Sequence, residues 1–200
     1  MSLPPHQLIT VGVIVGVIVA GSMVVHTPRA VGAPGEGSIS ALEESYLHKA
    51  SEGQRAEVDL GQLAVQKASS DPVKQYGARM IQDHQRAREE LQKLSKEVPR
   101  EAGELSMPHQ QIQRMLVQLS GKDFDKAYMS FMVRDHMKEV GEWEQRALTV
   151  TDARVERWMA SMLRLLKDHL EQGRAIAAAI GVNAEDIAKV EDATSPSHPY

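Results

Sequence analysis

Hydrophobic residues recur every three or four positions along several long segments of the chain, which is the spacing of one face of an α-helix. In the clearest segment, residues 155–179, the repeating positions are Val155, Trp158, Met162, Leu165, His169, Gln172, Ile176 and Ala179. Two other segments contain the sets Val73, Gly77, Met80, His84, Ala87, Leu91 and Leu94, and Met129, Met132, His136, Val140, Trp143 and Ala147. Each set has a histidine near its middle, directly after an aspartate. The pattern predicts packed helices with a polar side chain in each apolar interface.

Proline, glycine and short polar links separate the predicted helices. Four long helices are expected at about 42–68, 72–98, 123–148 and 153–181, with shorter ones at 108–119 and 184–190. Short links make the first two long helices, and likewise the last two, antiparallel neighbours. The link between the second and the third is long enough to return along a helix of roughly 40 Å. We therefore predict an all-α, ferritin-like four-helix bundle, in which two antiparallel hairpins are joined by a long crossover that contains a short helix.

A hydrophobic segment precedes the predicted bundle. Residues 8–25 carry no charge over eighteen positions, a length that can cross a bilayer when flanking residues help. No Lys or Arg precedes them, so the basic region of a signal peptide is absent, and we expect an uncleaved anchor rather than a removed signal. The predicted organisation is a membrane anchor or signal segment at 1–27, a flexible linker at 28–40, the bundle domain at 41–181 and a mostly disordered tail at 182–200.

The three histidines have a carboxylate counterpart on the first predicted helix. Glu57 lies near the middle of its inward face, at a depth similar to that of His84, His136 and His169 in their helices. Mid-helix positions of an antiparallel bundle meet at one level, so we expect these four side chains to converge on the bundle axis. A buried carboxylate and buried imidazoles need partners, and a transition metal ion such as Fe, Mn, Zn or Cu would serve them all.

Further residues extend this predicted metal site. Glu139, one turn after His136, is an additional oxygen donor, and the preceding aspartates Asp83, Asp135 and Asp168 are expected at best to orient the histidines. Two alternatives remain open from the sequence. The histidines and Glu57 could form a hydrogen-bonded layer that fixes the helix register without any metal, or the histidines could be partly exposed if the helices are rotated by one residue.

The remaining histidines and the methionines are not expected to have a chemical role. The other histidines fall in tails, the linker, an outer helix turn or a loop, and they are His6, His26, His48, His109 and His198. The ten methionines occur at helical spacing, so we interpret them as core residues rather than copper ligands.

Composition excludes several classes of function. The formal charge of the 200 residues is -4 and no basic block occurs, so nucleic acid is not an expected partner. The chain has no cysteine, which excludes thiol catalysis, disulfides and cysteine metal sites. No nucleophile triad, phosphate-binding glycine loop or nucleotide-binding motif occurs, so the sequence offers no support for a hydrolase or a kinase. Whether the protein is an enzyme stays open, with a non-catalytic protein expected more than an enzyme. The aromatic content of 4% favours helices over a β fold.

Three segments carry a resemblance to a known family: YLHKASEGQRAEVDLGQLAVQKASSDPVKQYGARMIQDH, SGKDFDKAYMSFMVRDH and LKDHL. They resemble the bacterial family called domain of unknown function 4142, whose members are exported proteins with a ferritin-like fold. The resemblance covers roughly residues 42–179, and Glu57, His84, His136 and His169 fall in its most recognisable stretches. It implies a bundle on the periplasmic side of a bacterial cell envelope, anchored or secreted, although Arg29 taken alone would keep the bundle in the cytoplasm.

The chain departs from the pattern of di-iron ferritin-like proteins, which carry two Glu-x-x-His pairs. The residues three positions before the histidines are Ile81, Val133 and Leu166. A mononuclear site is therefore expected. Two functional hypotheses follow: an envelope protein that stores, buffers or delivers a transition metal or performs minor redox chemistry with it, or a structural or stress-related module that binds another protein.

Overall fold

The regular elements of the computed structural model, which describes residues 38–96 and 104–194, are all α-helices. They are α1 (Ala41–Lys67), α2 (Asp71–Leu94), α3 (Met107–Gln118), α4 (Gly121–Ala147), α5 (Ala153–Ala179) and α6 (Ala184–Thr194). The all-α class predicted from the sequence is confirmed. None of the helices in these ranges is both long and apolar enough to cross a membrane, and the segment predicted as an anchor lies outside them.

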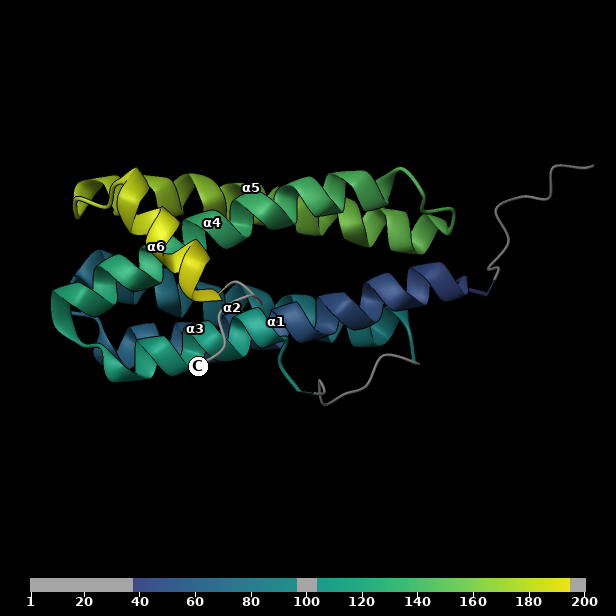
Figure 1. Ribbon diagram of the computed structural model, residues 1–200. Coiled ribbons are helices and arrows are strands. Elements are labelled where there is room, and N and C mark those ends of the chain that lie inside the picture. The colour runs from purple at the N-terminus through teal and green to yellow at the C-terminus, as the bar shows by residue number, and fades with distance from the viewer. Residues whose placement is uncertain (1–37, 97–103, 195–200) are drawn as a thin grey trace, which may run out of the picture. The chain divides into compact units, whose positions relative to one another are not determined.

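The long helices form two antiparallel hairpins that face each other. Helices α1 and α2 form one hairpin and α4 and α5 the other (Figure 1). The hairpins meet through contacts of α2 with α5 and of α1 with α4. Helix α3 belongs to the connection between the hairpins and contacts both α1 and α4, while α6 crosses over α4 and reaches α3.

Local sequence explains where the long helices begin. Ser40 caps α1 in a capping box with Glu43, and Asp152 caps α5 by accepting the backbone N–H groups of Arg154 and Val155. Proline occupies the first turn of α2 and of α3, where its missing N–H costs no helical hydrogen bond. Gly121 begins α4 with a φ of 61°, a conformation that favours glycine.

Four predicted boundaries differ from the structure by two residues or more. Helix α5 ends at Ala179 rather than near 181. Helix α2 ends at Leu94 rather than near 98, because Ser95 is extended and its hydroxyl donates to Glu44. Helix α4 begins at Gly121 rather than at 123. Helix α6 continues to Thr194, four residues beyond the short helix predicted at 184–190, and Val190 is buried in the core.

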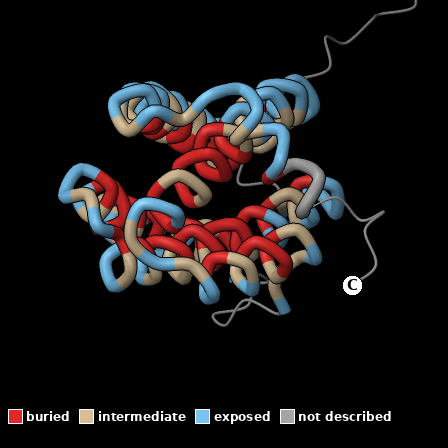
Figure 2. Tube along the Cα trace, turned by 60° about the vertical axis from the view of Figure 1, so that its left-hand side comes forward, coloured by how far each residue is buried: buried red, intermediate tan, exposed pale blue. Residues whose placement is uncertain are grey.

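The buried residues lie on the inner sides of the helices (Figure 2). Those that are apolar form two clusters, which come from opposite ends of the long helices. One cluster includes Leu60, Tyr76, Met80, Phe124, Tyr128 and Ala177. The other includes Leu47, Leu91, Trp143, Trp158, Met162 and Leu166. On each long helix, buried polar residues lie between the residues of one cluster and those of the other. They include Gln54 and Glu57 on α1, His84 on α2, His136 on α4 and His169 on α5, so a polar layer separates the two apolar clusters.

The predicted inward face of α5 is right in its first half and shifted in its second. Val155, Trp158 and Met162 are buried as expected, and so is His169. Beyond Met162, however, the buried apolar positions are Leu166, Gly173 and Ala177 rather than Leu165, Gln172, Ile176 and Ala179. A straight α-helix has 3.6 residues per turn, so a strict 3.5-residue pattern drifts off the buried face over several turns.

Candidate metal centre

Three histidines from three helices meet in the polar layer. His84 lies on α2, His136 on α4 and His169 on α5, and each side chain offers one ring nitrogen such that these atoms all lie within 4.8 Å of one another. The ring centroids are 5.2 Å apart for His84 and His169, 5.5 Å for His136 and His169, and 6.3 Å for His84 and His136. We call these residues the three-histidine cluster. At 0% to 1% exposed they are fully buried, which excludes the alternative of partly exposed histidines.

Each histidine of the cluster is oriented by one hydrogen bond to an oxygen atom. Nδ1 of His84 lies 2.7 Å from Oε1 of Gln54 on α1, and Nδ1 of His136 lies 3.0 Å from the carbonyl oxygen of Met132. Nε2 of His169 lies 2.9 Å from Oδ2 of Asp83. A carbonyl or carboxylate oxygen can only accept, so each of these ring nitrogens carries the hydrogen.

The opposite ring nitrogens are left with a lone pair. Within residues 38–96 and 104–194, the buried atoms Nε2 of His84, Nε2 of His136 and Nδ1 of His169 have no hydrogen-bond partner. These are the nitrogens that the tautomers above leave unprotonated. A buried polar atom without a partner is costly, so three of them close together call for a shared ligand.

Burial keeps the three imidazoles neutral. It lowers the pKa of His84 well below 6.5, and the nearby His169 and His136 lower it further. Burial likewise lowers the pKa of His136 to about 4, helped by His169. The pKa of His169 is also lowered by burial, against the opposing effect of the Asp83 hydrogen bond. Neutral imidazole is the form that binds a metal.

The donor set fits a divalent transition metal ion. Three neutral imidazole nitrogens suit Zn, Cu, Fe or Ni, and metal-binding histidines generally donate their other ring N–H to a carboxylate, a carbonyl or water. The cluster follows this arrangement at all three rings. On α1, three residues after Gln54, both oxygens of Glu57 are also buried without a hydrogen-bond partner among the described residues.

Comparison with known proteins identifies the family of the chain. A family model described as Domain of unknown function (DUF4142) matches residues 29–176. The chain belongs to this family. Searches of curated proteins and of solved structures found no match.

In this DUF4142 protein the three Asp-His dipeptides have three different environments. Asp83 orients His169, a histidine of another helix, and is itself held by Nε of Arg79 at 3.2 Å. Asp135 is buried and lies near His109. Asp168 is exposed. Within residues 38–96 and 104–194, Asp83 is the one of these three aspartates that hydrogen-bonds to a histidine of the cluster.

The two predicted glutamate ligands are not among the donor atoms that converge in the three-histidine cluster. Glu57 is buried and Glu139 is half-buried, but neither belongs to the group of donor atoms that converges within 4.8 Å. Burial raises the pKa of Glu57 well above 4.5, and the charges of Asp135 and Glu139 raise it further. The roles of Glu57 and Glu139 as ligands of the histidine site stay a prediction.

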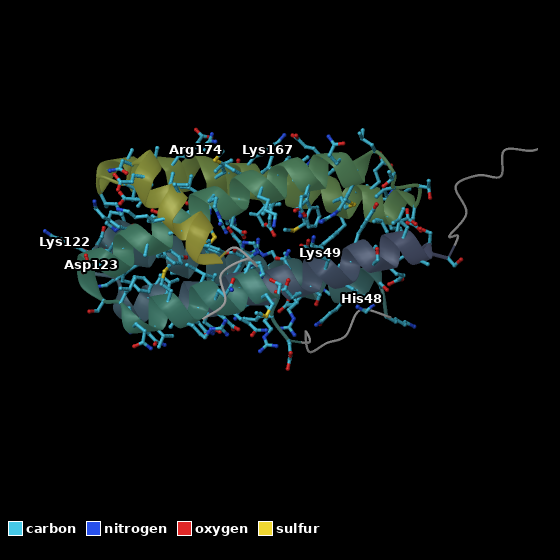
Figure 3. All side chains as sticks on the ribbon, viewed as in Figure 1. His48, Lys49, Lys122, Asp123, Lys167 and Arg174 are labelled. Carbon is cyan, nitrogen blue, oxygen red and sulfur yellow. The ribbon has the colours of Figure 1, made fainter. Side chains whose placement is uncertain are left out.

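His109, for which no role was expected, is a buried residue of the crossover helix α3. Its Nδ1 lies 2.8 Å from Oε1 of Glu52, and its Nε2 lies 3.6 Å from Oδ2 of Asp135. Burial acts to lower the pKa of His109, but these two carboxylates raise it to about 10. The sequence does contain a sign of this position, because His109 precedes Ile112 and Leu116 on the buried face of α3 by three and seven residues. His48, by contrast, is exposed on α1 as expected (Figure 3).

Proposed function

We propose that this DUF4142 protein binds one transition metal ion through His84, His136 and His169. The observation that carries the proposal is the different state of the two nitrogens in each ring. One nitrogen is hydrogen-bonded to an oxygen acceptor. The other is buried, close to the corresponding nitrogens of the other two rings, and without a hydrogen-bond partner in the described part of the chain. A bound ion would use all three lone pairs at once. A purely structural layer would leave these lone pairs without hydrogen bonds, because all three nitrogens are acceptors and none carries a hydrogen.

The arrangement of the helices supports a ferritin-like bundle as the framework of this site. Two antiparallel hairpins packed face to face, with a connection that includes α3, match the topology predicted from the link lengths. The histidines lack the Glu-x-x-His spacing of di-iron proteins, since Ile81, Val133 and Leu166 stand three residues before them. A single ion held by three nitrogens is accordingly the site that this framework offers.

The site suits storage, buffering or delivery of the metal at the bacterial cell envelope. The uncharged segment at 8–25 supports membrane anchoring, and the expectation of a periplasmic location for the family supports the envelope. Because the histidines are fully buried, the site suits retention of a metal ion better than rapid turnover of an external substrate. With a redox-active ion such as iron or copper bound, the centre would also supply one-electron chemistry. The residues of the chain bind the ion, set the tautomer of each ring and exclude water.

Elemental analysis of the full-length protein, purified without added metal, tests the proposal. We expect close to one transition metal ion per chain, and its loss in the triple variant His84→Ala, His136→Ala, His169→Ala with the helical circular dichroism retained. The matched control is His48→Ala, which removes an exposed histidine of α1 and should leave the metal content unchanged.

A titration of the wild-type protein keeps the test decisive should the triple variant fail to fold. Co²⁺ bound by three imidazoles gives visible absorption bands that report nitrogen ligation directly. Wild-type protein that carries no metal, and that takes up none of Fe²⁺, Mn²⁺, Zn²⁺, Cu²⁺ or Co²⁺ on titration, would refute the site. The histidines would then form the structural layer of the alternative hypothesis, in a protein whose role is to bind another protein.

A further inference from the structure

The residues that orient the three histidines differ in their contact with solvent. Gln54 and Met132 orient the histidines of α2 and α4, and both are buried. The side chain of Asp83, by contrast, is 20% exposed, although its partner His169 is fully buried. On the side between α2 and α5, a single side chain therefore separates a ring nitrogen of the three-histidine cluster from solvent.

Two polar contacts between α2 and α5 close this side of the cluster. Nε2 of His169 donates to Oδ2 of Asp83 at 2.9 Å, and Nη1 of Arg79 donates to Oε1 of Gln172 at 2.8 Å. Each helix contributes residues three or four positions apart, so the two contacts lie about one turn from each other. Nε of Arg79 also donates to Oδ2 of Asp83 at 3.2 Å and joins the two contacts. We call these four residues the α2–α5 strap.

A separate, buried contact holds the backbone of α5 against α2 at the same level. The hydroxyl of Tyr76 donates to the carbonyl oxygen of His169 at 3.2 Å. Gly173 leaves room for this hydroxyl, since a Cβ at that position would stand 3.2 Å from it. Opening of the strap therefore needs only side chains to turn, while the two helices stay in contact.

The strap is easier to open than the contacts that orient the other two histidines. An ion pair exposed to solvent contributes little, because water replaces the partners and salt screens the charges, and the side chain of Arg79 is 37% exposed. Breaking the hydrogen bonds of Gln54 or Met132 would instead leave buried groups without a partner, which is costly. The side between α2 and α5 is thus the one that opens most often.

We infer that the α2–α5 strap is the gate through which a metal ion enters and leaves the three-histidine cluster. The inference rests on the proposed function, because it concerns the same site. When the guanidinium of Arg79 turns into solvent, the carboxylate of Asp83 loses its cationic partner, attracts a cation, and no longer holds the ring of His169. When Arg79 returns, Asp83 is drawn back and Nδ1 of His169 again faces the other two histidines.

Stopped-flow measurements with Co²⁺ on the full-length protein test the gate. The visible bands of the bound ion report its uptake, and a chase with a chelator reports its release. Arg79→Met removes the guanidinium and keeps the aliphatic stem. We expect it to raise both rates about tenfold, as for the loss of an ion pair and a hydrogen bond, while the dissociation constant changes by less than about threefold. Arg55→Met is the matched control, because Arg55 forms an i,i+4 pair of similar exposure with Asp59 on α1.

Proton exchange in the metal-free protein, followed by ¹⁵N NMR, tests the same opening without any ion. In the wild type, the Nε2–H of His169 should exchange with water faster than the Nδ1–H groups of His84 and His136. Arg79→Met should speed the exchange at His169 about tenfold and leave the other two unchanged. Arg55→Met should leave all three as in the wild type.

The outcomes distinguish a failure of the gate from a failure of the metal site. Co²⁺ that binds to the wild type at rates left unchanged by Arg79→Met would overturn the gate and leave the metal site standing. Faster release without faster uptake would do the same, because Arg79 would then only strengthen binding. Equal exchange of the three imidazole protons in the wild type would place the opening elsewhere. A wild type that takes up none of the metal ions named above would refute the metal site, and the gate with it.

Discussion

His169 and Asp83 are 86 positions apart in the chain, and Nε2 of the histidine lies 2.9 Å from Oδ2 of the aspartate. This contact joins α5 to α2 and determines which nitrogen of His169 faces the other two histidines. Arg79 holds the aspartate in place through Nε at 3.2 Å, and its Nη1 donates to Oε1 of Gln172 at 2.8 Å. A chain of polar contacts therefore fixes the ring of His169 from outside the three-histidine cluster.

Asp83→Asn is expected to weaken metal binding about 10- to 100-fold, the range found when a residue that orients a metal-binding histidine is lost. The amide keeps the shape of the side chain but removes the negative charge that makes His169 a better donor. Competition with a chelator of known affinity measures the change for Zn²⁺ or Co²⁺. Asp168→Asn is the matched control, because Asp168 precedes His169 directly but is exposed. Equal affinities of the two variants would contradict this role of Asp83.

The convergence of the histidines could be predicted from the sequence, whereas their hydrogen-bond partners could not. His84, His136 and His169 interrupt helical patterns at similar depth, and helix geometry then brings them to one level. The partner of His169 comes from α2 and that of His84 from α1, and such contacts depend on how the helices are rotated against each other. A periodic pattern determines that rotation only to within about one residue. The shift from Leu165 to Leu166 on the buried face of α5 shows an error of this size.

The ion pairs of His109 with Glu52 and Asp135 could not be predicted from the sequence for a related reason. His109 belongs to the crossover helix α3, and the two-residue link from α3 to α4 does not determine the position of α3 against α1. Without that position, Glu52 and Asp135 look like ordinary polar residues of two separate helices. Only the packed structure shows that His109 lies between them.

The stability of the fold should fall as the pH rises through the range in which His109 loses its proton. The folded pKa of His109, about 10, lies above the value of 6.5 for an unfolded histidine. The ion pairs of His109 with Glu52 and Asp135 thus stabilise the fold fully below pH 6.5, and this contribution is lost progressively between about pH 6.5 and 10. Urea unfolding at several pH values measures the effect.

His109→Gln isolates the contribution of this histidine. Breaking a buried ion pair costs about 3–5 kcal/mol, so the variant should be less stable than the wild type near pH 6. The gap between the two proteins should narrow as the pH approaches 10. A gap that stays constant across this range would show that His109 is not protonated in the folded protein.

The close contact of α1 with α2 depends on two glycines. A Cβ on Gly61 would lie 2.7 Å from the carbonyl oxygen of Gly77, and a Cβ on Gly77 would lie 2.6 Å from Cβ of Ala64. Gly61→Ala and Gly77→Ala should therefore force the helices apart and destabilise the fold by about 1–3 kcal/mol. Chemical denaturation followed by circular dichroism measures the change.

Gly141→Ala provides the control for these two variants. Gly141 is an exposed residue within α4, and nothing lies within 4 Å of a Cβ placed on it. Because alanine favours a helix over glycine, this variant should be more stable than the wild type by about 0.5–1 kcal/mol. Stabilisation by all three substitutions would mean that α1 and α2 are not in close contact.

Glu43 links the start of α1 to the loop between α4 and α5, and this link should fail in acid. Its carboxylate accepts the backbone N–H groups of Thr151 at 2.7 Å and Asp152 at 2.8 Å, and also the N–H and hydroxyl groups of Ser40. Burial acts to raise the pKa of Glu43, but these hydrogen bonds, first among them that of the Ser40 side chain, lower it from 4.5 to about 2.

Because the folded pKa of Glu43 is the lower one, its stabilising contribution is complete above about pH 4.5 and is lost as the pH falls toward 2. Glu43→Gln should reduce the free energy of unfolding at pH 7 by about 1–3 kcal/mol, since an amide presents one acceptor oxygen where the carboxylate presents two. Near pH 2.5 the difference from the wild type should be much smaller. The exposed α5 residue Glu171 serves as the control, and Glu171→Gln should behave as the wild type at both pH values. A Glu43→Gln deficit that is equally large at both would show that the carboxylate charge does not stabilise this link.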